Sequence, residues 1–393
     1  MKTLNFMDSI SIVEKDGSKN LLLIFSARNS AKGKFTFWDK FKSLPATRIY
    51  INDYNNEWYT NGIPDYPSED KLIKFLEECK RKYIKGGKLW ILGTSMGAYA
   101  ALKYGAKLKA DRIVAFNPEN TLGMTFSKSI ENTDAINNSE YKLDLCSLEY
   151  KKDGEVIIVS NNGNFIDMYS ANKLKNSIST SKVYILNNFK HNTLEELNKT
   201  RNVDELLGQM ISKGSSLGLS DLQKCPLFKD EEIEVLKELN ENLILENKII
   251  NVDVKLVEKM LQKCPDSGYF NFLYGLSLNS LGFKSSSVSY LNKSLAYTPF
   301  LGRAAIKLAQ IYNELKEYDH AIFLLEPICR KNFNIKALMI LCTAYEKSGL
   351  FQSSLSALDF NILNNKNKSG KISVERRRKL LLSKHPKLLT FVN

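Results

Sequence analysis

Hydrophobic and polar positions in the first half of the chain follow two alternating patterns. Short apolar runs typical of buried strands recur, and stretches with helical periodicity lie between most of them. This alternation predicts a mainly parallel β-sheet covered by helices on both faces. The expected strands span residues 10–13, 20–25, 47–51, 88–92, 112–116, 155–160 and 182–186, and the expected helices span residues 68–83, 96–104, 170–177 and 193–210.

The pattern changes at residues 213–220, a stretch rich in glycine and serine that predicts a linker. Beyond this stretch the strand-like runs disappear. Helical periodicity covers residues 231–247 and 252–263, so the second half of the chain is expected to be all-helical.

A repeat of about 34 residues then covers residues 267–362. Gly275, Ala309 and Cys342 hold the same place in successive copies, and the pattern resembles tetratricopeptide repeats. These features divide the chain into an α/β domain at 1–212, a linker at 213–220, a helical tetratricopeptide-like domain at 221–365 and a basic C-terminal helix or tail at 366–393.

The net charge of +13 is unevenly spread along the 393 residues. Residues 351–393 hold nine basic and two acidic side chains, a balance of +7, and residues 1–50 hold nine and four, a balance of +5. Basic surfaces of this kind attract an acidic polymer, a nucleic acid or an anionic lipid surface. The plain alternative is a solvated basic tail.

Cysteine and histidine usage bears on the compartment. Six cysteines are scattered without the spacing of a metal site, and three histidines are few for a zinc protein. The longest early apolar run, residues 21–25, is too short for a membrane span or a signal sequence. We therefore expect a cytoplasmic protein with reduced cysteines and no metal.

The most informative motif is Gly93-Thr94-Ser95-Met96-Gly97, which lies between the strand at 88–92 and an alanine-rich helix. A Gly-x-Ser-x-Gly motif between a strand and a helix is typical of the nucleophile elbow of the α/β-hydrolase fold. In that turn the serine is exposed at the edge of the sheet, and the helix N-terminus favours developing negative charge. Ser95 is therefore the predicted nucleophile.

A serine nucleophile needs a histidine base and a carboxylate that orients it, and in this fold they follow the serine in the order acid, histidine. His191 is the histidine that fits, because it follows the last strand across a short loop. Asp167 is the carboxylate in the loop after the strand at 155–160. The alternative acid is Glu119, just after the preceding strand.

An oxyanion hole would use the backbone N–H of Met96, the residue after the nucleophile, with a second N–H from the loop after an early strand. Ala27 and Arg28 are the candidates for that second donor. Residues 120–149 interrupt the alternation of strands and helices and are expected to form a lid over the elbow.

Side chains near the expected mouth of the site are candidates for binding an acceptor. Arg28 and Lys34 would hold an anionic group, and Trp58 and Tyr59 would stack on a sugar ring if they are exposed. Ordinary surface charges and loop packing are the alternatives for these four residues.

Taken together, these motifs resemble the α/β-hydrolase-type O-acetyltransferases of bacterial capsule polysaccharides. The resemblance covers residues 10–210 and implies a two-step reaction. Acetyl-CoA acetylates Ser95, and a hydroxyl of an anionic capsular polysaccharide then attacks the acetyl-enzyme, with His191 as general base and Asp167 orienting it. The matching residues are Phe25-Ser26-Ala27, Lys34-Phe35-Thr36-Phe37, Asp53, Trp58-Tyr59, Gly62, the elbow, Asp167 and His191.

The helical repeats are expected to dock the enzyme to a capsule-synthesis protein or to hold the polymer chain. That role implies a position at the inner face of the membrane by peripheral association, and no nucleic acid partner. Two other classes of function stay open: a serine carboxylesterase, deacetylase or thioesterase with the same triad, and a repeat scaffold whose hydrolase domain is degenerate.

Overall fold

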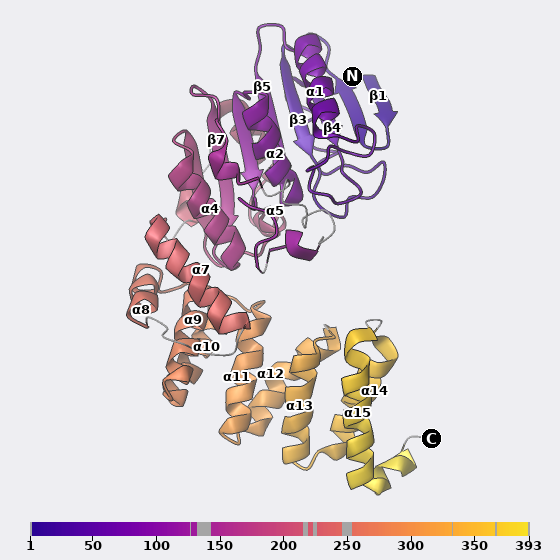
Figure 1. Cartoon of the computed structure of the whole chain (residues 1–393), viewed down its shortest axis with the longest axis vertical. Helices are drawn as coiled ribbons and strands as arrows, with labels where there is room; N and C mark the ends of the chain where they lie inside the picture. The colour runs from indigo at the N-terminus through magenta and orange to yellow at the C-terminus, as the bar shows by residue number, and fades with distance from the viewer. Residues whose placement is uncertain are drawn as a thin grey trace. The chain divides into compact units, whose positions relative to one another are not determined.

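The computed structural model describes residues 2–125, 127–131, 143–214, 219–222, 226–245, 254–331, 333–365 and 368–391. Its contacts divide the chain into two compact units, Met1–Asn251 and Val252–Asn393. Figure 1 shows a sheet flanked by helices in the first unit and helices alone in the second. The predicted succession of an α/β domain and an all-α domain is confirmed.

The sheet has eight strands in the order β1-β2-β4-β3-β5-β6-β7-β8. β1 pairs antiparallel with β2, β2 pairs antiparallel with β4, and every other neighbouring pair is parallel. The seven predicted strands are present, and β1 is an additional edge strand. The strands are β1 (Lys2–Met7), β2 (Ile10–Glu14), β3 (Asn20–Phe25), β4 (Ala46–Ile51), β5 (Leu89–Thr94), β6 (Arg112–Phe116), β7 (Glu155–Asn161) and β8 (Ser181–Leu186).

Helices cover both faces of this sheet, as predicted (Figure 1). Because successive side chains of a strand point to opposite faces, the continuous apolar runs of the central strands are buried on both sides. Leu22 and Leu92 pack with Leu207 of α6 (Val203–Lys213). The helices α1 (Glu69–Tyr83), α2 (Met96–Lys107) and α4 (Phe165–Ser177) also contact the strands.

Two predicted helix boundaries differ from the structure. The helix expected at 170–177 begins at Phe165, because the Asn164 side chain caps it by accepting the Ile166 N–H. The helix expected at 193–210 is two helices, α5 (Thr193–Asn198) and α6, and Asn202 caps the second. Short 3₁₀ turns occur at Ser129–Glu131, Leu145–Ser147 and Leu219–Leu222.

The helix α7 (Asp230–Leu245) belongs to the sheet unit. The Tyr169 hydroxyl on α4 lies 2.8 Å from Glu234, and Lys173 lies 3.4 Å from Asp230 and 3.2 Å from Glu234. These contacts hold α7 against α4. The division between the units therefore lies at residues 251/252, beyond the linker predicted at 213–220.

The second unit consists of consecutive helices that form hairpins. The turn of each repeat has one residue with positive φ, at Gly282 (86°), Lys316 (64°) and Gly349 (77°). These turns recur with the predicted period, so the repeat is confirmed. The helices are α8 (Val254–Lys263), α9 (Gly268–Ser280), α10 (Lys284–Tyr297), α11 (Gly302–Glu314), α12 (Tyr318–Lys331), α13 (Ile335–Lys347), α14 (Phe351–Asn364) and α15 (Lys368–Lys384), followed by a 3₁₀ turn at Pro386–Phe391.

Small residues allow the two helices of a hairpin to approach closely. Gly275, Ala309 and Cys342 are buried at the equivalent position of α9, α11 and α13. A Cβ atom on Gly275 would lie 2.9 Å from Cγ of Leu291 on the partner helix. The predicted close-packing position of the repeat is thus observed.

No helix in the described part of the chain is long and apolar enough to cross a membrane. Cys79, Cys146, Cys329 and Cys342 have free thiols, whereas Cys264 is disulfide-bonded. The expectation that every cysteine is reduced is therefore wrong at Cys264.

Candidate active site

Ser95 lies at the sharp turn between β5 and α2. Its backbone has φ 53° and ψ −119°, a conformation that is strained for any residue other than glycine. The Ser95 N–H donates to Phe116 O at 2.8 Å, which ties the turn to the end of the neighbouring strand β6. The strain is held by the surrounding sheet, as a nucleophile elbow requires.

The two glycines of the motif are required by close backbone contacts. A Cβ on Gly93 would lie 1.9 Å from Gly97 O, and a Cβ on Gly97 would lie 2.2 Å from Phe25 O. Real Cβ atoms do not approach that closely. The missing side chains let the end of β3 lie directly against the start of α2.

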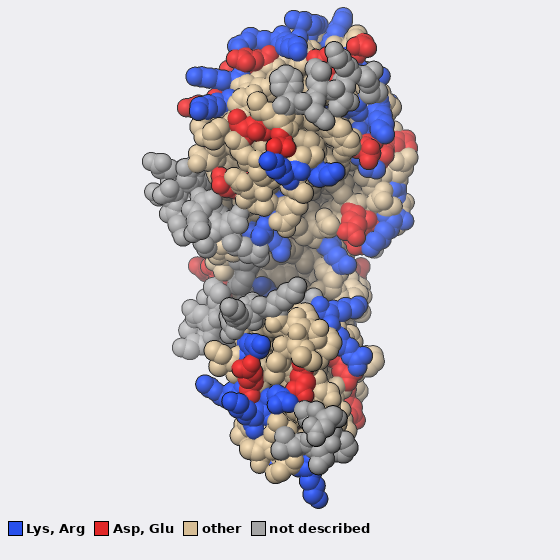
Figure 2. All heavy atoms as spheres, turned by 90° about the vertical axis from the view of Figure 1, so that its right-hand side faces the viewer, with Lys and Arg blue, Asp and Glu red and all other residues tan. Residues whose placement is uncertain are grey.

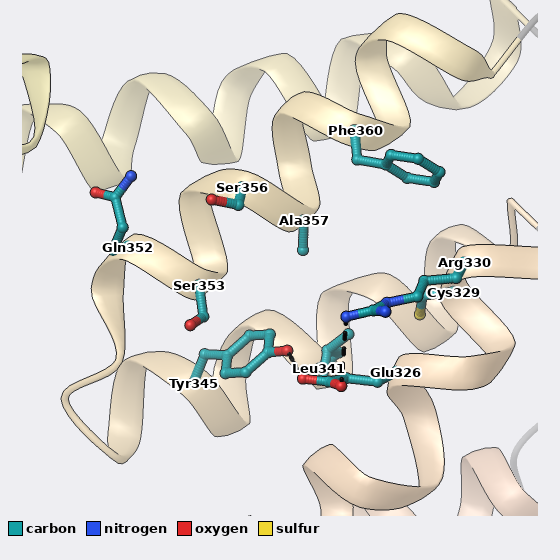
Figure 3. A pocket seen from close by; sticks show the side chains of 10 residues that line it. All are labelled: Glu326, Cys329, Arg330, Leu341, Tyr345, Gln352, Ser353, Ser356, Ala357 and Phe360. Carbon is teal, nitrogen blue, oxygen red and sulfur yellow. Dashed lines mark hydrogen bonds and ion pairs between the residues drawn. The ribbon is translucent and has the colours of Figure 1, made fainter. Parts of the chain in front are cut away.

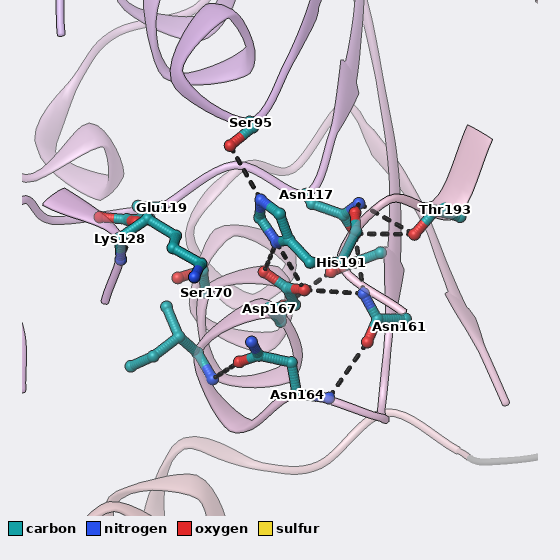
Figure 4. Close-up of polar contacts among 12 residues, drawn as sticks. Ser95, Asn117, Glu119, Lys128, Asn161, Asn164, Asp167, Ser170, His191 and Thr193 are labelled. Carbon is teal, nitrogen blue, oxygen red and sulfur yellow. Dashed lines mark hydrogen bonds and ion pairs between the residues drawn. The ribbon is translucent and has the colours of Figure 1, made fainter. Parts of the chain in front are cut away.

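The structure brings together the three residues that the sequence predicts as a triad (Figure 4). Ser95 Oγ lies 2.8 Å from His191 Nε2. His191 Nδ1 lies 2.8 Å from Asp167 Oδ1 and 2.9 Å from Oδ2. The arrangement can move a proton from the serine hydroxyl to the imidazole while the carboxylate fixes the tautomer of the ring.

Burial and charge affect the ionisation of Asp167 and His191 in this relay. Asp167 is 2% exposed and lies in the first turn of α4, where the helix dipole stabilises an anion. Burial by itself would lower the pKa of His191. The charge and hydrogen bond of Asp167 outweigh burial and raise the pKa of His191 above its ordinary value of 6.5. The imidazolium formed during a proton transfer is therefore stabilised.

Two buried amides that the sequence did not single out connect the loops of the site. Asn161 Nδ2 donates to Asp167 Oδ2 at 2.7 Å and to Asn117 Oδ1 at 3.1 Å. Asn117 Nδ2 donates in turn to His191 O and to Thr193 Oγ1. The pair links the carboxylate to the backbone of the histidine loop. The available signal was that Asn117 and Asn161 lie at the ends of β6 and β7, beside the elbow.

Glu119, the alternative acid, has a different role. Its carboxylate accepts from the N–H groups of Lys128 and Ser129 and from the Ser129 hydroxyl, while His191 bonds to Asp167. Burial raises the pKa of Glu119 to about 7 despite these hydrogen bonds. Glu119 therefore holds the start of the predicted lid; residue 126 and residues 132–142 of that lid lie outside the described residues.

Glu119→Gln is expected to retain most activity. The amide oxygen still accepts a backbone hydrogen bond, and the triad carboxylate is intact. The loss in kcat should be far smaller than the ~10⁴-fold loss expected when the triad carboxylate becomes an amide in Asp167→Asn. Comparing kcat of the two variants on one ester checks this. A loss of kcat in Glu119→Gln as large as that in Asp167→Asn would instead identify Glu119 as the carboxylate of the triad.

The backbone groups predicted for an oxyanion hole lie at two adjoining places. Met96 is the first residue of α2, where the N–H groups have no acceptor within the helix. The Ala27 N–H donates to Thr36 Oγ1 at 3.0 Å, so this group already has an acceptor within its own loop. That bond disfavours Ala27 as the second donor, and Arg28, its neighbour in the same loop, stays the other candidate.

The four acceptor-binding candidates separate into two pairs. Lys34 is exposed and Arg28 is half-buried, with Nη1 donating to Lys128 O at 3.3 Å. Trp58 and Tyr59 are 0% exposed, so the prediction that these aromatic rings face a sugar is wrong. They fold inward because both have positive φ, 58° and 55°, in a tight turn.

Tyr59 instead supports the loop that follows β3. Its hydroxyl donates to Ser26 O at 2.9 Å, and its N–H donates to Asp53 Oδ2 at 3.1 Å. Burial raises the pKa of Asp53 to about 6. Tyr59 thus positions the backbone beside the elbow and does not face a ligand.

The mainly parallel sheet, the serine on a strand–turn–helix and the histidine and aspartate from later loops define the α/β-hydrolase fold class. No protein-family model matches the sequence, and no curated protein matches it. Among solved structures, the capsule O-acetyltransferase of Neisseria meningitidis serogroup A is similar over 50% of this chain and 90% of that chain, with 17% identity and a TM-score of 0.40. MamA (41-end) from Desulfovibrio magneticus RS-1 is similar over 41% of this chain and 89% of that chain, with 15% identity and a TM-score of 0.33.

Proposed function

We propose that the chain is a serine-dependent O-acetyltransferase that moves an acetyl group from acetyl-CoA to hydroxyls of an anionic capsular polysaccharide. One observation carries the serine chemistry: Ser95 Oγ, His191 and Asp167 form a continuous hydrogen-bonded relay at 2.8 Å per step. The choice of donor and acceptor rests on the sequence resemblance to capsule O-acetyltransferases.

In the first step Ser95 Oγ attacks the thioester carbonyl while His191 Nε2 takes the hydroxyl proton. The C–S bond breaks, His191 returns the proton to the departing thiol, and the acetyl group stays on Ser95. In the second step His191 takes a proton from a sugar hydroxyl, which attacks the acetyl-serine. The C–O bond to Ser95 breaks, and the proton passes to Ser95 Oγ.

Backbone N–H groups stabilise the oxyanion of each tetrahedral intermediate. The Met96 N–H is one donor, and the N–H of Arg28 is the remaining candidate for the second. The direct contact between Gly97 and the end of β3 sets the spacing of the two donors, because it fixes one backbone segment against the other.

The test is to incubate the protein with acetyl-CoA and a panel of bacterial capsular polymers, measuring free thiol and polymer-bound acetyl together. Thiol release that depends on an anionic polymer and is absent in Ser95→Ala is the expected result. Acetyl-CoA consumption that is indifferent to every polymer would overturn the proposed acceptor.

A serine carboxylesterase, deacetylase or thioesterase is the second candidate, because the same relay activates water as readily as a sugar hydroxyl. It predicts release of free acetate in place of polymer-bound acetyl. A scaffold with a degenerate site predicts that a fluorophosphonate probe leaves Ser95 unlabelled, and the intact relay argues against that outcome.

The pH dependence should report His191. A general base acts when neutral, so activity is lost as pH falls through the pKa of His191, which lies above 6.5. Asp167→Asn removes the charge that raises this pKa while burial, which lowers it, remains. NMR titration of the His191 ring in both proteins is expected to show a lower midpoint in the variant. An unchanged midpoint would contradict the coupling to Asp167, and His320 and His385 serve as internal references.

A further inference from the structure

Described residues of the helical unit line a pair of cavities that have similar sizes and different charges. The first, of about 510 Å³, lies among α12, α13 and α14 (Figure 3). Leu341, Ala357 and Phe360 form its apolar part. Its two charged residues offset each other, since Arg330 lies 3.8 Å from Glu326. Charge in this cavity therefore selects neither anions nor cations.

The second cavity, of about 460 Å³, lies between α13 and α15 and is cationic. Figure 2 shows Lys and Arg side chains interspersed with Asp and Glu on the face of the helical unit that it draws. We name this cavity the α15 pocket. Its lining includes Ser373, Arg376, Arg377, Leu380 and Lys384 from α15 and Glu346 from α13.

The acidic residue of the α15 pocket is already neutralised. Glu346 Oε1 accepts from Arg377 Nε at 3.1 Å and from Arg377 Nη2 at 3.0 Å. Arg377 also donates to Met339 O and to Thr343 Oγ1, so its donors serve to hold α15 against α13. This pair contributes no net charge to the pocket.

Arg376 and Lys384 supply the remaining positive charge. Both are exposed, and neither forms an ion pair within the part of the chain that the structure describes. Both side chains line the α15 pocket. They lie eight residues apart on α15, so their Cα atoms are separated by about 12 Å along the helix axis. Leu380 lies between them and Ser373 adds a hydroxyl. The pocket thus suits an extended ligand with anionic groups spaced along it.

The lining favours a glycan over a nucleic acid. Single-stranded nucleic acids bind by stacking bases on exposed aromatic rings. The one ring in the α15 pocket belongs to His385, and it already stacks on Phe351 with the ring centroids 3.8 Å apart. The cationic side chains can bind the carboxylates or phosphates of an acidic sugar chain, and the serine hydroxyl can bind its hydroxyl groups.

We infer that the α15 pocket binds an anionic stretch of the acceptor polysaccharide, an inference that rests on the proposed function. A polymer held there stays attached to the chain that carries Ser95, which raises its effective concentration. Loss of the site should therefore raise KM for the polymer and leave hydrolysis of a small ester unchanged.

The test uses the full-length protein and a polygalacturonate oligomer, with neutral dextran as the negative control. The variants are Arg376→Ala/Lys384→Ala and, as a matched control from the first cavity, Arg330→Ala. We expect the double variant to weaken polygalacturonate binding by about tenfold or more, and Arg330→Ala to leave it unchanged. All proteins should hydrolyse a small acetyl ester at the wild-type rate.

Equal weakening in Arg330→Ala, or binding that the double variant leaves unaltered, would overturn the inference. Tighter binding of single-stranded DNA or poly-glutamate at the same two residues would replace the glycan with that ligand. Failure of the proposed function would give a different result. In that case the protein would not consume acetyl-CoA, but polygalacturonate would still bind the α15 pocket.

Discussion

Ser95→Ala is expected to lower acyl transfer by about 10⁴- to 10⁶-fold, because it removes the atom that forms the acyl-enzyme. His191→Ala should cost a similar factor, since an unassisted hydroxyl is a poor nucleophile near neutral pH. The measurement is the initial rate of thiol release from acetyl-CoA together with hydrolysis of a small acetyl ester.

The triad should also behave as one unit. Ser95→Ala/His191→Ala is expected to lose little more than either single variant, because each residue acts only through the other. Ser177→Ala, an exposed serine at the end of α4, is the matched control and should keep the wild-type rate. Losses that multiply in the double variant would show that Ser95 and His191 act independently and would remove the relay from the mechanism.

Gly97→Ala is expected to destabilise the protein by more than about 3 kcal/mol or to prevent folding. The new Cβ would lie 2.2 Å from Phe25 O and 2.8 Å from Ser26 O, backbone atoms at and just after the end of β3 that cannot rotate away. Urea unfolding followed by far-UV circular dichroism measures the change.

Gly208→Ala is the matched control for this prediction. Gly208 lies within α6, and a Cβ there meets nothing within 4 Å. Alanine should stabilise that helix by about 0.5–1 kcal/mol, since glycine is the weaker helix former. A Gly97→Ala protein as stable as the wild type would mean that β3 and α2 separate easily at this contact.

The elbow and the order of the triad could be predicted because each depends on local sequence. Gly93 and Gly97 flank Ser95 at fixed spacing, and a strand and a helix must adjoin them. The folding of a parallel sheet then brings the later loops to the same edge. His191 and Asp167 therefore lie near Ser95 once the strand order is known.

Features that depend on tertiary packing could not be predicted. Trp58 and Tyr59 occupy a loop rich in polar residues, yet both have positive φ and are buried. Tyr59 is held there by hydrogen bonds to Ser26 and Asp53. Asn117 and Asn161 lie at strand ends beside the elbow, but that position does not specify a hydrogen bond between side chains 44 residues apart. The boundary between the two units could not be predicted either, because α7 is held in the sheet unit by side-chain contacts with α4.

The contact of Gly97 with the carbonyl oxygen of Phe25 has a consequence for how such an enzyme diversifies. At this contact the main chain at the start of α2, next to Ser95, lies directly against the main chain at the end of β3. No side chain sets the distance between these two segments. Substitutions among the side chains around the site can therefore change which ligand fits there without moving Ser95. Ligand selectivity and the geometry of the triad can therefore change separately in this fold.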